Sequence, residues 1–228
     1  MELQGRYLRN KSLISDEEQK FLKEKTVAVI GAGGLGGYIC EGLTRIGIGR
    51  LIIIDGDVFE ESNLNRQRFA TESTLGHPKA RVVKDALKEI NSDVIIGAFE
   101  VRIDQYNAMD LLKDADVVID GVDNISSRIM LEEVCESLNI PLVHGAIGGW
   151  YGQVGVVYPG DKTLSKLYPD PNGVGVEKKL GNPSFTPMLI ASYEVAQGVK
   201  VLLNKGEILR NKIMYFDLLN DQVIHIDL

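Results

Sequence analysis

Cysteine is scarce in this sequence: only Cys40 and Cys135 occur among its 228 residues. A disulfide framework and a four-cysteine zinc site both need more thiols than this, so both are excluded and no zinc is expected. Cys135 falls on the apolar face of an expected helix, and Cys40 follows a glycine-rich loop. We interpret both thiols as residues of the hydrophobic core.

Basic runs and long hydrophobic runs are also absent. Lysine and arginine number 25 against 32 aspartates and glutamates, which gives a net charge of -7. Proteins that bind nucleic acid phosphates usually carry a basic stripe, so the balance disfavours nucleic acid as a partner. No stretch reaches the ~20 apolar residues that a membrane span needs, and residues 1–25 hold no apolar signal-peptide segment. We therefore expect a cytoplasmic protein that does not enter a membrane.

The first two thirds of the chain alternate between short apolar runs and amphipathic segments. Strands are expected at Val27–Ile30, Leu51–Ile54, Val94–Ala98, Val117–Ile119 and Leu142–His144. Helices are expected from a Ser15 N-cap to Lys25, from the glycine loop to Gly47, and over Pro78–Ile90, Gln105–Lys113 and Ser126–Leu138. This alternation predicts an α/β, Rossmann-like fold, with a mainly parallel sheet and helices on both faces.

The pattern changes after Gly148 and Gly149. Partly antiparallel strands are expected at Val154–Tyr158, Lys212–Asp217 and Gln222–Asp227, with a long helix over Pro187–Leu203 and a loop over 161–185. We expect one domain over 1–228. Its parts would be an N-terminal arm and helix (1–25), a core (26–150) and a C-terminal part (151–228).

A glycine loop stands between the first expected strand and the helix after it. Gly31, Gly33, Gly34 and Gly36 satisfy the pattern G-x-G-x-x-G. Such glycines let backbone N–H groups approach a phosphate closely at a helix N-terminus. Asp55 closes the second strand, where a carboxylate accepts hydrogen bonds from ribose hydroxyls. The loop predicts nucleotide binding; the alternative is that its glycines serve only close helix–sheet packing.

Charged side chains near the expected strand ends indicate which nucleotide is bound. Arg66 and Lys79 are cations suited to phosphate oxygens, Arg68 is a further candidate, and Asp123 follows the fourth strand. Several cations and a carboxylate suit a triphosphate with magnesium, whereas a dinucleotide carries less charge. The sequence thus favours ATP and Mg²⁺ over NAD.

At these residues the sequence resembles the ThiF/MoeB/HesA family, the bacterial relatives of ubiquitin-activating enzymes. The resemblance covers about residues 5–158. The motifs that carry it are Arg6-Tyr7-Leu8-Arg9, Gly31-Ala32-Gly33-Gly34-Leu35-Gly36, Asp55-Gly56-Asp57, Ser62-Asn63-Leu64-Asn65-Arg66-Gln67, Gly76-His77-Pro78-Lys79-Ala80, Asp120-Gly121-Val122-Asp123-Asn124 with Arg128, and Gly145-Ala146 followed by Gly152-Gln153-Val154.

The resemblance implies a reaction and a partner. The family uses ATP and magnesium to adenylate the C-terminal glycine of a ubiquitin-like sulfur carrier, ThiS- or MoaD-like and ending in Gly-Gly, for thiamine or molybdopterin biosynthesis. Such a protein releases pyrophosphate and acts as an adenylyltransferase. By this resemblance, residues 1–228 would be a single ThiF-type nucleotide-binding domain, in which 26–150 bind the nucleotide and 151–228 bind the carrier.

The resemblance also implies a role for each matching residue. Asp55 would hold the ribose, Asn63, Arg66 and Lys79 the phosphates, and Asp123 the magnesium ion. The nucleotide-binding set is completed by Asp57, Gln67, Asn124 and Arg128. Arg9 would reach into the partner subunit's site, which implies a homodimer.

The sequence departs from the family in its cysteines. Many members carry two Cys-x-x-Cys pairs that bind zinc, and some carry a cysteine in a crossover loop that takes the carrier's acyl group. Leu180–Met188, the corresponding stretch, has none. We therefore expect adenylation alone on this chain, with sulfur delivered by another protein.

Other interpretations stay open at this point. One is activation of a modified transfer RNA base, as in the threonylcarbamoyladenosine dehydratases, and others are an NAD(P)-dependent oxidoreductase and a non-catalytic binding protein. His144 is interpreted as a packed histidine rather than a site residue. Trp150 and Tyr151 would either receive a carrier's tail or pack in the core.

Overall fold

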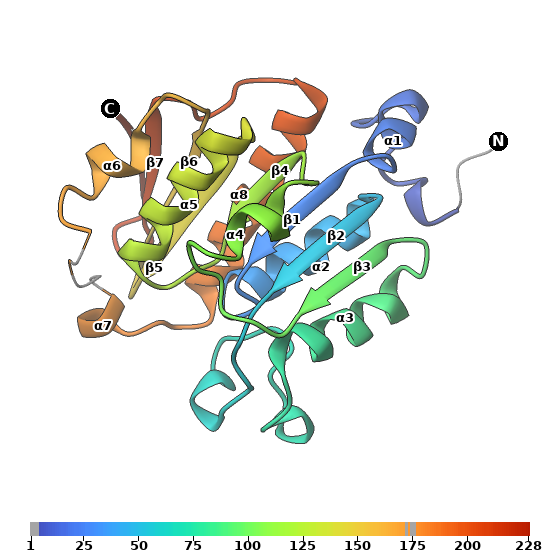
Figure 1. Ribbon diagram of the computed structural model, residues 1–228, viewed down its shortest axis with the longest axis horizontal. Coiled ribbons are helices and arrows are strands. Elements are labelled where there is room, and N and C mark those ends of the chain that lie inside the picture. Colours follow the sequence, from blue (N-terminus) through green and yellow to red (C-terminus); the bar gives the residue numbers. More distant parts are fainter. Residues whose placement is uncertain (1–4, 172, 174–176) are drawn as a thin grey trace.

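The computed structural model describes residues 5–171, 173 and 177–228. Its strands form one eight-stranded sheet in the order β3-β2-β1-β4-β5-β6-β7-β8 (Figure 1). The strands are β1 (Thr26–Ile30), β2 (Arg50–Ile54), β3 (Ile95–Phe99), β4 (Val117–Asp120), β5 (Leu142–Gly148), β6 (Tyr151–Val157), β7 (Lys212–Asp217) and β8 (Gln222–Asp227). Pairing is parallel from β3 to β5 and antiparallel from β5 to β8. The expected mainly parallel sheet with an antiparallel C-terminal part is confirmed.

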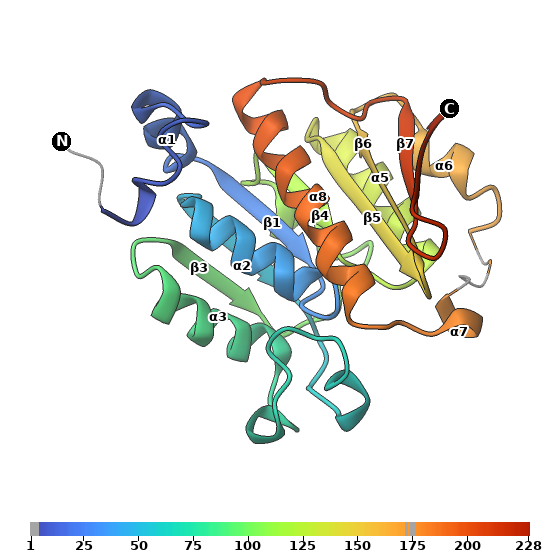
Figure 2. The same ribbon diagram turned by 180° about the vertical axis from the view of Figure 1, so that it is seen from behind.

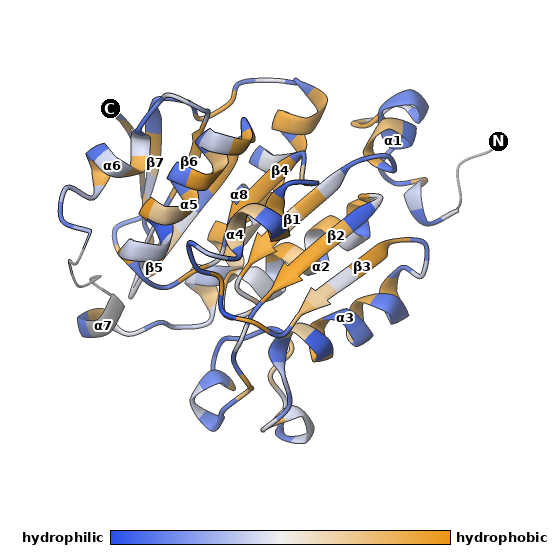
Figure 3. Cartoon of the chain, viewed as in Figure 1, coloured by the Kyte–Doolittle hydropathy of each residue, from blue (hydrophilic) through white to orange (hydrophobic). Residues whose placement is uncertain are grey.

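Helices cover both faces of this sheet. They are α1 (Asp16–Leu22), α2 (Gly36–Ile46), α3 (Lys79–Ile90), α4 (Ala108–Leu112), α5 (Ile125–Leu138), α6 (Thr163–Leu167), α7 (Glu177–Leu180) and α8 (Phe185–Leu203). One core cluster joins α2, α3 and α8 to the sheet, and a second joins α4 and α5 to the opposite face (Figures 1 and 2). Burial on both faces explains why β1, β2 and β4 read as unbroken apolar runs, which Figure 3 shows in orange.

Local signals set the ends of several helices. Ser15 caps α1 through a reciprocal capping box with Glu18, as its sequence predicts. Gly47, with φ +88°, ends α2. No helix in the described part of the chain is long and apolar enough to cross a membrane.

Two expectations about local structure were wrong. The helix expected over Gln105–Lys113 is only α4, because Asp104 and Asn107 exchange side-chain to backbone hydrogen bonds and form a turn before it. The loop expected over 161–185 contains the short helices α6 and α7, although residues 172 and 174–176 lie outside the described part.

The topology reverses direction between β1 and β4. The connection after β1 runs through α2 on one face, whereas the connection after β4 runs through α5 on the other. In open α/β sheets the crevice at the carboxyl ends of two such strands is where ligands bind. The fold therefore predicts a ligand-binding crevice at the carboxyl ends of β1 and β4.

Candidate functional site

A cavity of about 400 Å³ lies at the carboxyl ends of β1, β2 and β4. Its size falls within the range of small-molecule sites. The predicted site residues that line it are Gly31, Gly33, Gly34, Asp55, Asp57, Arg66, Gln67, Lys79, Asp123, Asn124 and Arg128. The structure thus gathers eleven predicted positions from six separate stretches of sequence around one space.

The four glycines of the loop divide into two pairs. A side chain on Gly31 would come within 2.7 Å of the Gly121 carbonyl oxygen, and one on Gly36 within 1.8 Å of the Gly31 carbonyl oxygen. Gly33 and Gly34 instead face the cavity, where the nearest side chains, Gln67 and Arg66, lie at 3.5 and 3.8 Å from the added carbon. One pair therefore serves close packing, and the other leaves backbone open to a ligand.

Asp55 is fixed by the loop that it faces. Its Oδ2 accepts the Ala32 N–H at 2.7 Å, and its Oδ1 accepts the Asp57 N–H at 2.7 Å. Burial raises the pKa of this carboxyl, and the two hydrogen bonds oppose that shift. The spare lone pairs of both oxygens remain available to ribose hydroxyls.

Several cations line the cavity. Lys79 opens α3, and its Nζ lies 3.7 Å from Asp57 Oδ2. The other carboxylate oxygen, Asp57 Oδ1, accepts a hydrogen bond from Arg102 at 2.9 Å. Arg66 is oriented by two acceptors, the Ser62 carbonyl and the Asn65 side chain, at 3.0 and 2.9 Å. These cations are suited to neutralising phosphate oxygens.

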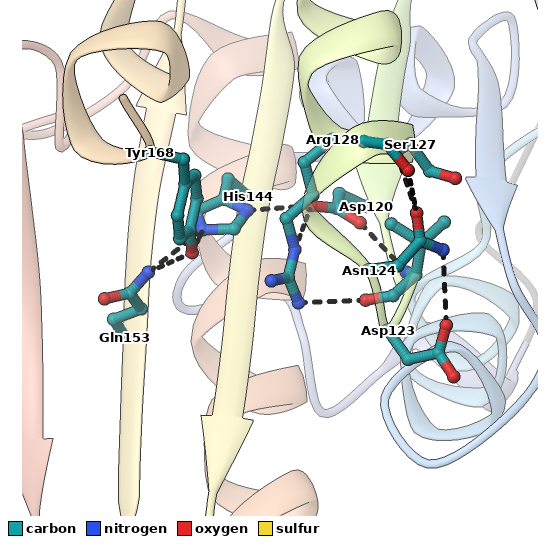
Figure 4. Close-up of polar contacts among 10 residues, drawn as sticks. Asp120, Asp123, Asn124, Ser127, Arg128, His144, Gln153 and Tyr168 are labelled. Atoms are coloured by element: carbon teal, nitrogen blue, oxygen red, sulfur yellow. Dashed lines mark hydrogen bonds and ion pairs between the residues drawn. The ribbon is translucent and has the colours of Figure 1, made fainter. Parts of the chain in front are cut away.

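Asp123 and Asn124 follow β4 and directly precede the N-terminus of α5 (Figure 4). Asn124 is the N-cap of α5, since its Oδ1 accepts the Ser127 N–H at 2.8 Å. Asp123 is exposed and lines the cavity. The N-terminus of α5, with its favourable dipole for anions, therefore opens beside the same space.

Two acceptor atoms at the cavity lack partners among the described residues. Gln67 Oε1 and Asn182 Oδ1 are buried, and neither has a hydrogen bond. An unpaired buried acceptor costs free energy, so a rotation of either side chain that brings its oxygen to a donor on a ligand would be stabilising.

Four other candidates lie away from this cavity lining. Asn63 is buried, and its side chain accepts the Glu60 N–H and donates to Ser62. Gly36 packs beneath the loop, and Arg68 pairs with Glu41 at 2.6 Å. Arg9 is exposed in the N-terminal arm, so its predicted reach into a partner subunit stays a prediction.

Sequence reasoning missed several residues of the cavity. They are Val101, Arg102, Ile103, Ser127, Ile147 and Asn182, besides the Gly121–Val122 backbone. Arg102 follows β3, the third strand to end at this edge, and a side chain on Gly56 would come within 2.7 Å of its backbone nitrogen. The position of Arg102 just after β3 was the signal in the sequence that could have placed it at this edge of the sheet.

The donor set fits magnesium held together with a triphosphate. No cluster of three or more His, Cys, Asp or Glu side chains suited to a metal occurs among the described residues. Magnesium on ATP uses mainly phosphate oxygens, water and one or two carboxylates. Asp123 lines the cavity and is a carboxylate that would fit this role. A site of this kind therefore needs no cage made by protein alone.

Known proteins are similar to this chain in sequence and in fold. The sequence profile of the ThiF family matches residues 7–228. The SAMP-activating enzyme E1 of Haloferax volcanii is 33% identical over 207 residues, which are 90% of this chain and 77% of that protein. The sulfur carrier protein adenylyltransferase of Thermus thermophilus is 34% identical over 215 residues, 90% and 79% of the two chains. The adenylyltransferase and sulfurtransferase MOCS3 of Arabidopsis thaliana is 33% identical, and the match spans only 45% of its length.

Solved structures agree on the fold. The crystal structure of E. coli MccB with ATP superposes with a TM-score of 0.83 at 22% identity, covering 99% of this chain and 72% of that one. The crystal structure of selenomethionine PaaA gives 0.82 at 22% identity, covering 99% and 74%. At this identity the likeness concerns the fold alone. Together with the sequence matches, it confirms the resemblance: the chain belongs to the ThiF family.

Proposed function

We propose that this protein uses ATP to adenylate the C-terminal glycine carboxylate of a small ubiquitin-like sulfur carrier protein that ends in Gly-Gly. The observation that carries the proposal is the cavity that unites Gly33, Asp55, Arg66, Lys79 and Asp123 at the ends of β1, β2 and β4. The names of the relatives, a SAMP-activating E1 and a sulfur carrier protein adenylyltransferase, support the same activity.

The chemistry asks for position and charge rather than for a general base. The carrier's carboxylate is ionised near pH 7, and one of its oxygens attacks the α-phosphorus while the bond to the β-phosphate oxygen breaks. Arg66 and Lys79 would neutralise the leaving pyrophosphate, and Asp55 would hold the ribose. Asp123 would hold magnesium, which when bound adds charge neutralisation on the phosphates.

The number of cations favours ATP over a nicotinamide dinucleotide. Arg66, Lys79, Arg102 and Arg128 all line the cavity. An NAD(P) enzyme would give Asp123 and most of these cations no task. Fluorescence titration distinguishes the two, because tight NAD(P)H binding without ATP binding would contradict adenylation.

The direct test is ATP–pyrophosphate exchange with a carrier that ends in Gly-Gly. Exchange of label into ATP is expected with the intact carrier and is expected to vanish when the two glycines are deleted. Exchange that needs transfer RNA instead of a carrier would favour the threonylcarbamoyladenosine alternative. The exchange rate is measured separately with a ThiS-like and a MoaD-like carrier. The carrier that supports exchange shows whether the protein serves thiamine or molybdopterin biosynthesis.

No acyl transfer to this chain is part of the proposal, because its two thiols are inert. Burial raises the pKa of the Cys135 thiol from 9.0 to about 12, which lowers its thiolate fraction about 1000-fold. Cys40 is fully buried, and its pKa is raised further. The Cys40→Ala/Cys135→Ala variant is therefore expected to keep full exchange activity. Because both thiols are buried, native protein should react with a disulfide reagent roughly 100-fold or more slower than protein in urea, and rapid native labelling would contradict this.

The proposed homodimer shares its sites through Arg9. Arg9→Ala and Asp123→Ala are each expected to be inactive alone. If Arg9 acts in the partner's site, an equal mixture of the two variants regains about a quarter of the wild-type exchange rate, because half the dimers then hold one intact site of two. If the mixture stays inactive after subunit exchange, Arg9 does not act across subunits.

A further inference from the structure

A buried polar network lies behind the cavity and reaches the loop that carries Asp123 (Figure 4). Asp120 ends β4, and His144 is its register partner on the parallel strand β5. Both side chains are completely buried, and neither residue lines the cavity. His144 Nδ1 lies 2.7 Å from Asp120 Oδ2. The proposed nucleotide chemistry assigns no task to either residue.

The hydrogen-bond partners of His144 assign the tautomer of its neutral ring. A carboxylate only accepts, so Nδ1–H of His144 donates to Asp120, and in the neutral ring Nε2 is then an acceptor. The Tyr168 hydroxyl, 3.1 Å from Nε2, then donates to it and itself accepts the Gln153 amide at 2.6 Å. Burial also lowers the pKa of His144, which agrees with a neutral ring at pH 7.

The other end of the network holds the backbone beside Asp123. Asp120 Oδ1 accepts the Val122 N–H at 2.9 Å, and Arg128 Nη2 donates to the Val122 carbonyl at 3.0 Å. The Arg128 guanidinium lies 3.5 Å from Asp120 Oδ2, the oxygen that also accepts from His144. Both backbone groups of Val122 are therefore bonded by members of one buried ion pair.

Asp123 depends on this backbone for its place. Its side chain is exposed, and its Oδ1 accepts a long 3.4 Å hydrogen bond from Asn124. Side-chain contacts of this kind hold a carboxylate weakly, whereas a ligand for a metal triphosphate has to be placed within about 0.5 Å. The bonds to Val122, directly before Asp123, supply that rigidity.

We propose that His144 is a positioning residue: by fixing the Asp120 carboxylate and through it Arg128 and Val122, it holds Asp123 where magnesium-bound triphosphate is received. This role of His144 rests on the proposed function, because that function supplies the ligand, ATP with magnesium. The fixing of the Val122 backbone by His144 does not depend on the proposed function.

Three variants separate positioning from simple packing. His144→Leu keeps most of the volume and removes both ring nitrogens, whereas His144→Asn keeps an N–H donor close to the position of Nδ1. Gln197→Met is the matched control, since Gln197 on α8 is also buried and accepts one hydrogen bond, from the Leu209 N–H. Thermal unfolding shows that each variant is folded.

Two readouts are followed in each variant, neither of which needs turnover. Hydrogen exchange reports the protection of the Val122 amide, and calorimetry reports ATP affinity with Mg²⁺ and with EDTA. In His144→Leu we expect the Val122 amide to exchange about 10-fold faster or more, and ATP affinity with Mg²⁺ to fall about 10-fold or more. Affinity in EDTA is expected to fall by a smaller factor, because Arg128 is the nucleotide-binding cation that depends on Asp120, whereas Asp55 and the glycine loop are untouched. His144→Asn should recover most of both losses, and Gln197→Met should show neither.

Several results would overturn the proposal. A folded His144→Leu with wild-type protection of Val122 would remove it, and so would equal losses of ATP affinity with and without Mg²⁺. If wild-type protein binds no ATP, the proposed function fails. Hydrogen exchange of the Val122 amide in His144→Leu still decides whether His144 fixes that backbone.

A measurement on the unaltered protein covers the case in which His144→Leu does not fold. Nitrogen NMR of the imidazole is expected to show the Nδ1–H tautomer, with Nε2 bare. The Nε2–H tautomer would break the link to Asp120 and overturn the proposal.

Discussion

Replacement of Asp123 by alanine is expected to lower carrier-dependent ATP–pyrophosphate exchange about 100-fold or more, equivalent to about 3 kcal/mol of lost transition-state stabilisation. Asp123 is the exposed carboxylate of the cavity at the N-terminus of α5. Its loss removes the protein's own contact to magnesium at the step in which negative charge passes to pyrophosphate. Because the side chain is exposed, the free energy of unfolding should hardly change.

Two companion variants make this result specific. Asp123→Asn keeps the shape and an oxygen for Asn124 but not the charge, so it should lose nearly as much exchange activity as alanine. Asp110→Ala removes another exposed carboxylate, on α4, where it pairs with Lys113 at 3.2 Å, and this variant should keep full activity. Exchange that survives unaltered in Asp123→Ala would refute the proposed magnesium contact.

The antiparallel strands show how far local pattern determines structure here. The expected strands Lys212–Asp217 and Gln222–Asp227 match β7 and β8 residue for residue. Their ends are set by local turn residues such as Asn211 and Asp221, both at positive φ. The α4 helix was misjudged because side-chain bonds of Asp104 and Asn107 compete with helix formation, an effect that helical periodicity does not reveal.

Some residues of the candidate site could be predicted from the sequence, and others could not. The glycine loop, Asp55 and Asp123 stand at strand ends, so alternation of strands and helices already predicts that they meet at one edge. Arg102 and Asn182 come from segments without a motif, and only the folded sheet brings them there. The pairing of His144 with Asp120 depends on the register of β4 against β5, which the sequence does not state.

Gly36 and Gly33 offer the largest expected contrast between packing and ligand binding within a single loop. In Gly36→Ala the new carbon would stand 1.8 Å from the Gly31 carbonyl oxygen, so the backbone itself would have to move. We expect a loss of about 3 kcal/mol or more in the free energy of unfolding, which lowers Tm by roughly 10 °C. ATP binding would be lost together with the loop.

Gly33→Ala is the matched variant. Its new carbon meets Gln67 Nε2 at an ordinary 3.5 Å, so the fold tolerates it and Tm should stay within about 2 °C of wild type. The same methyl group enters the space where backbone N–H groups would meet phosphate, so ATP affinity should fall about 10-fold. Thermal unfolding and calorimetry on both variants measure the two effects. If Gly33→Ala binds ATP as wild type does, the loop serves packing only, and its part in nucleotide binding is refuted.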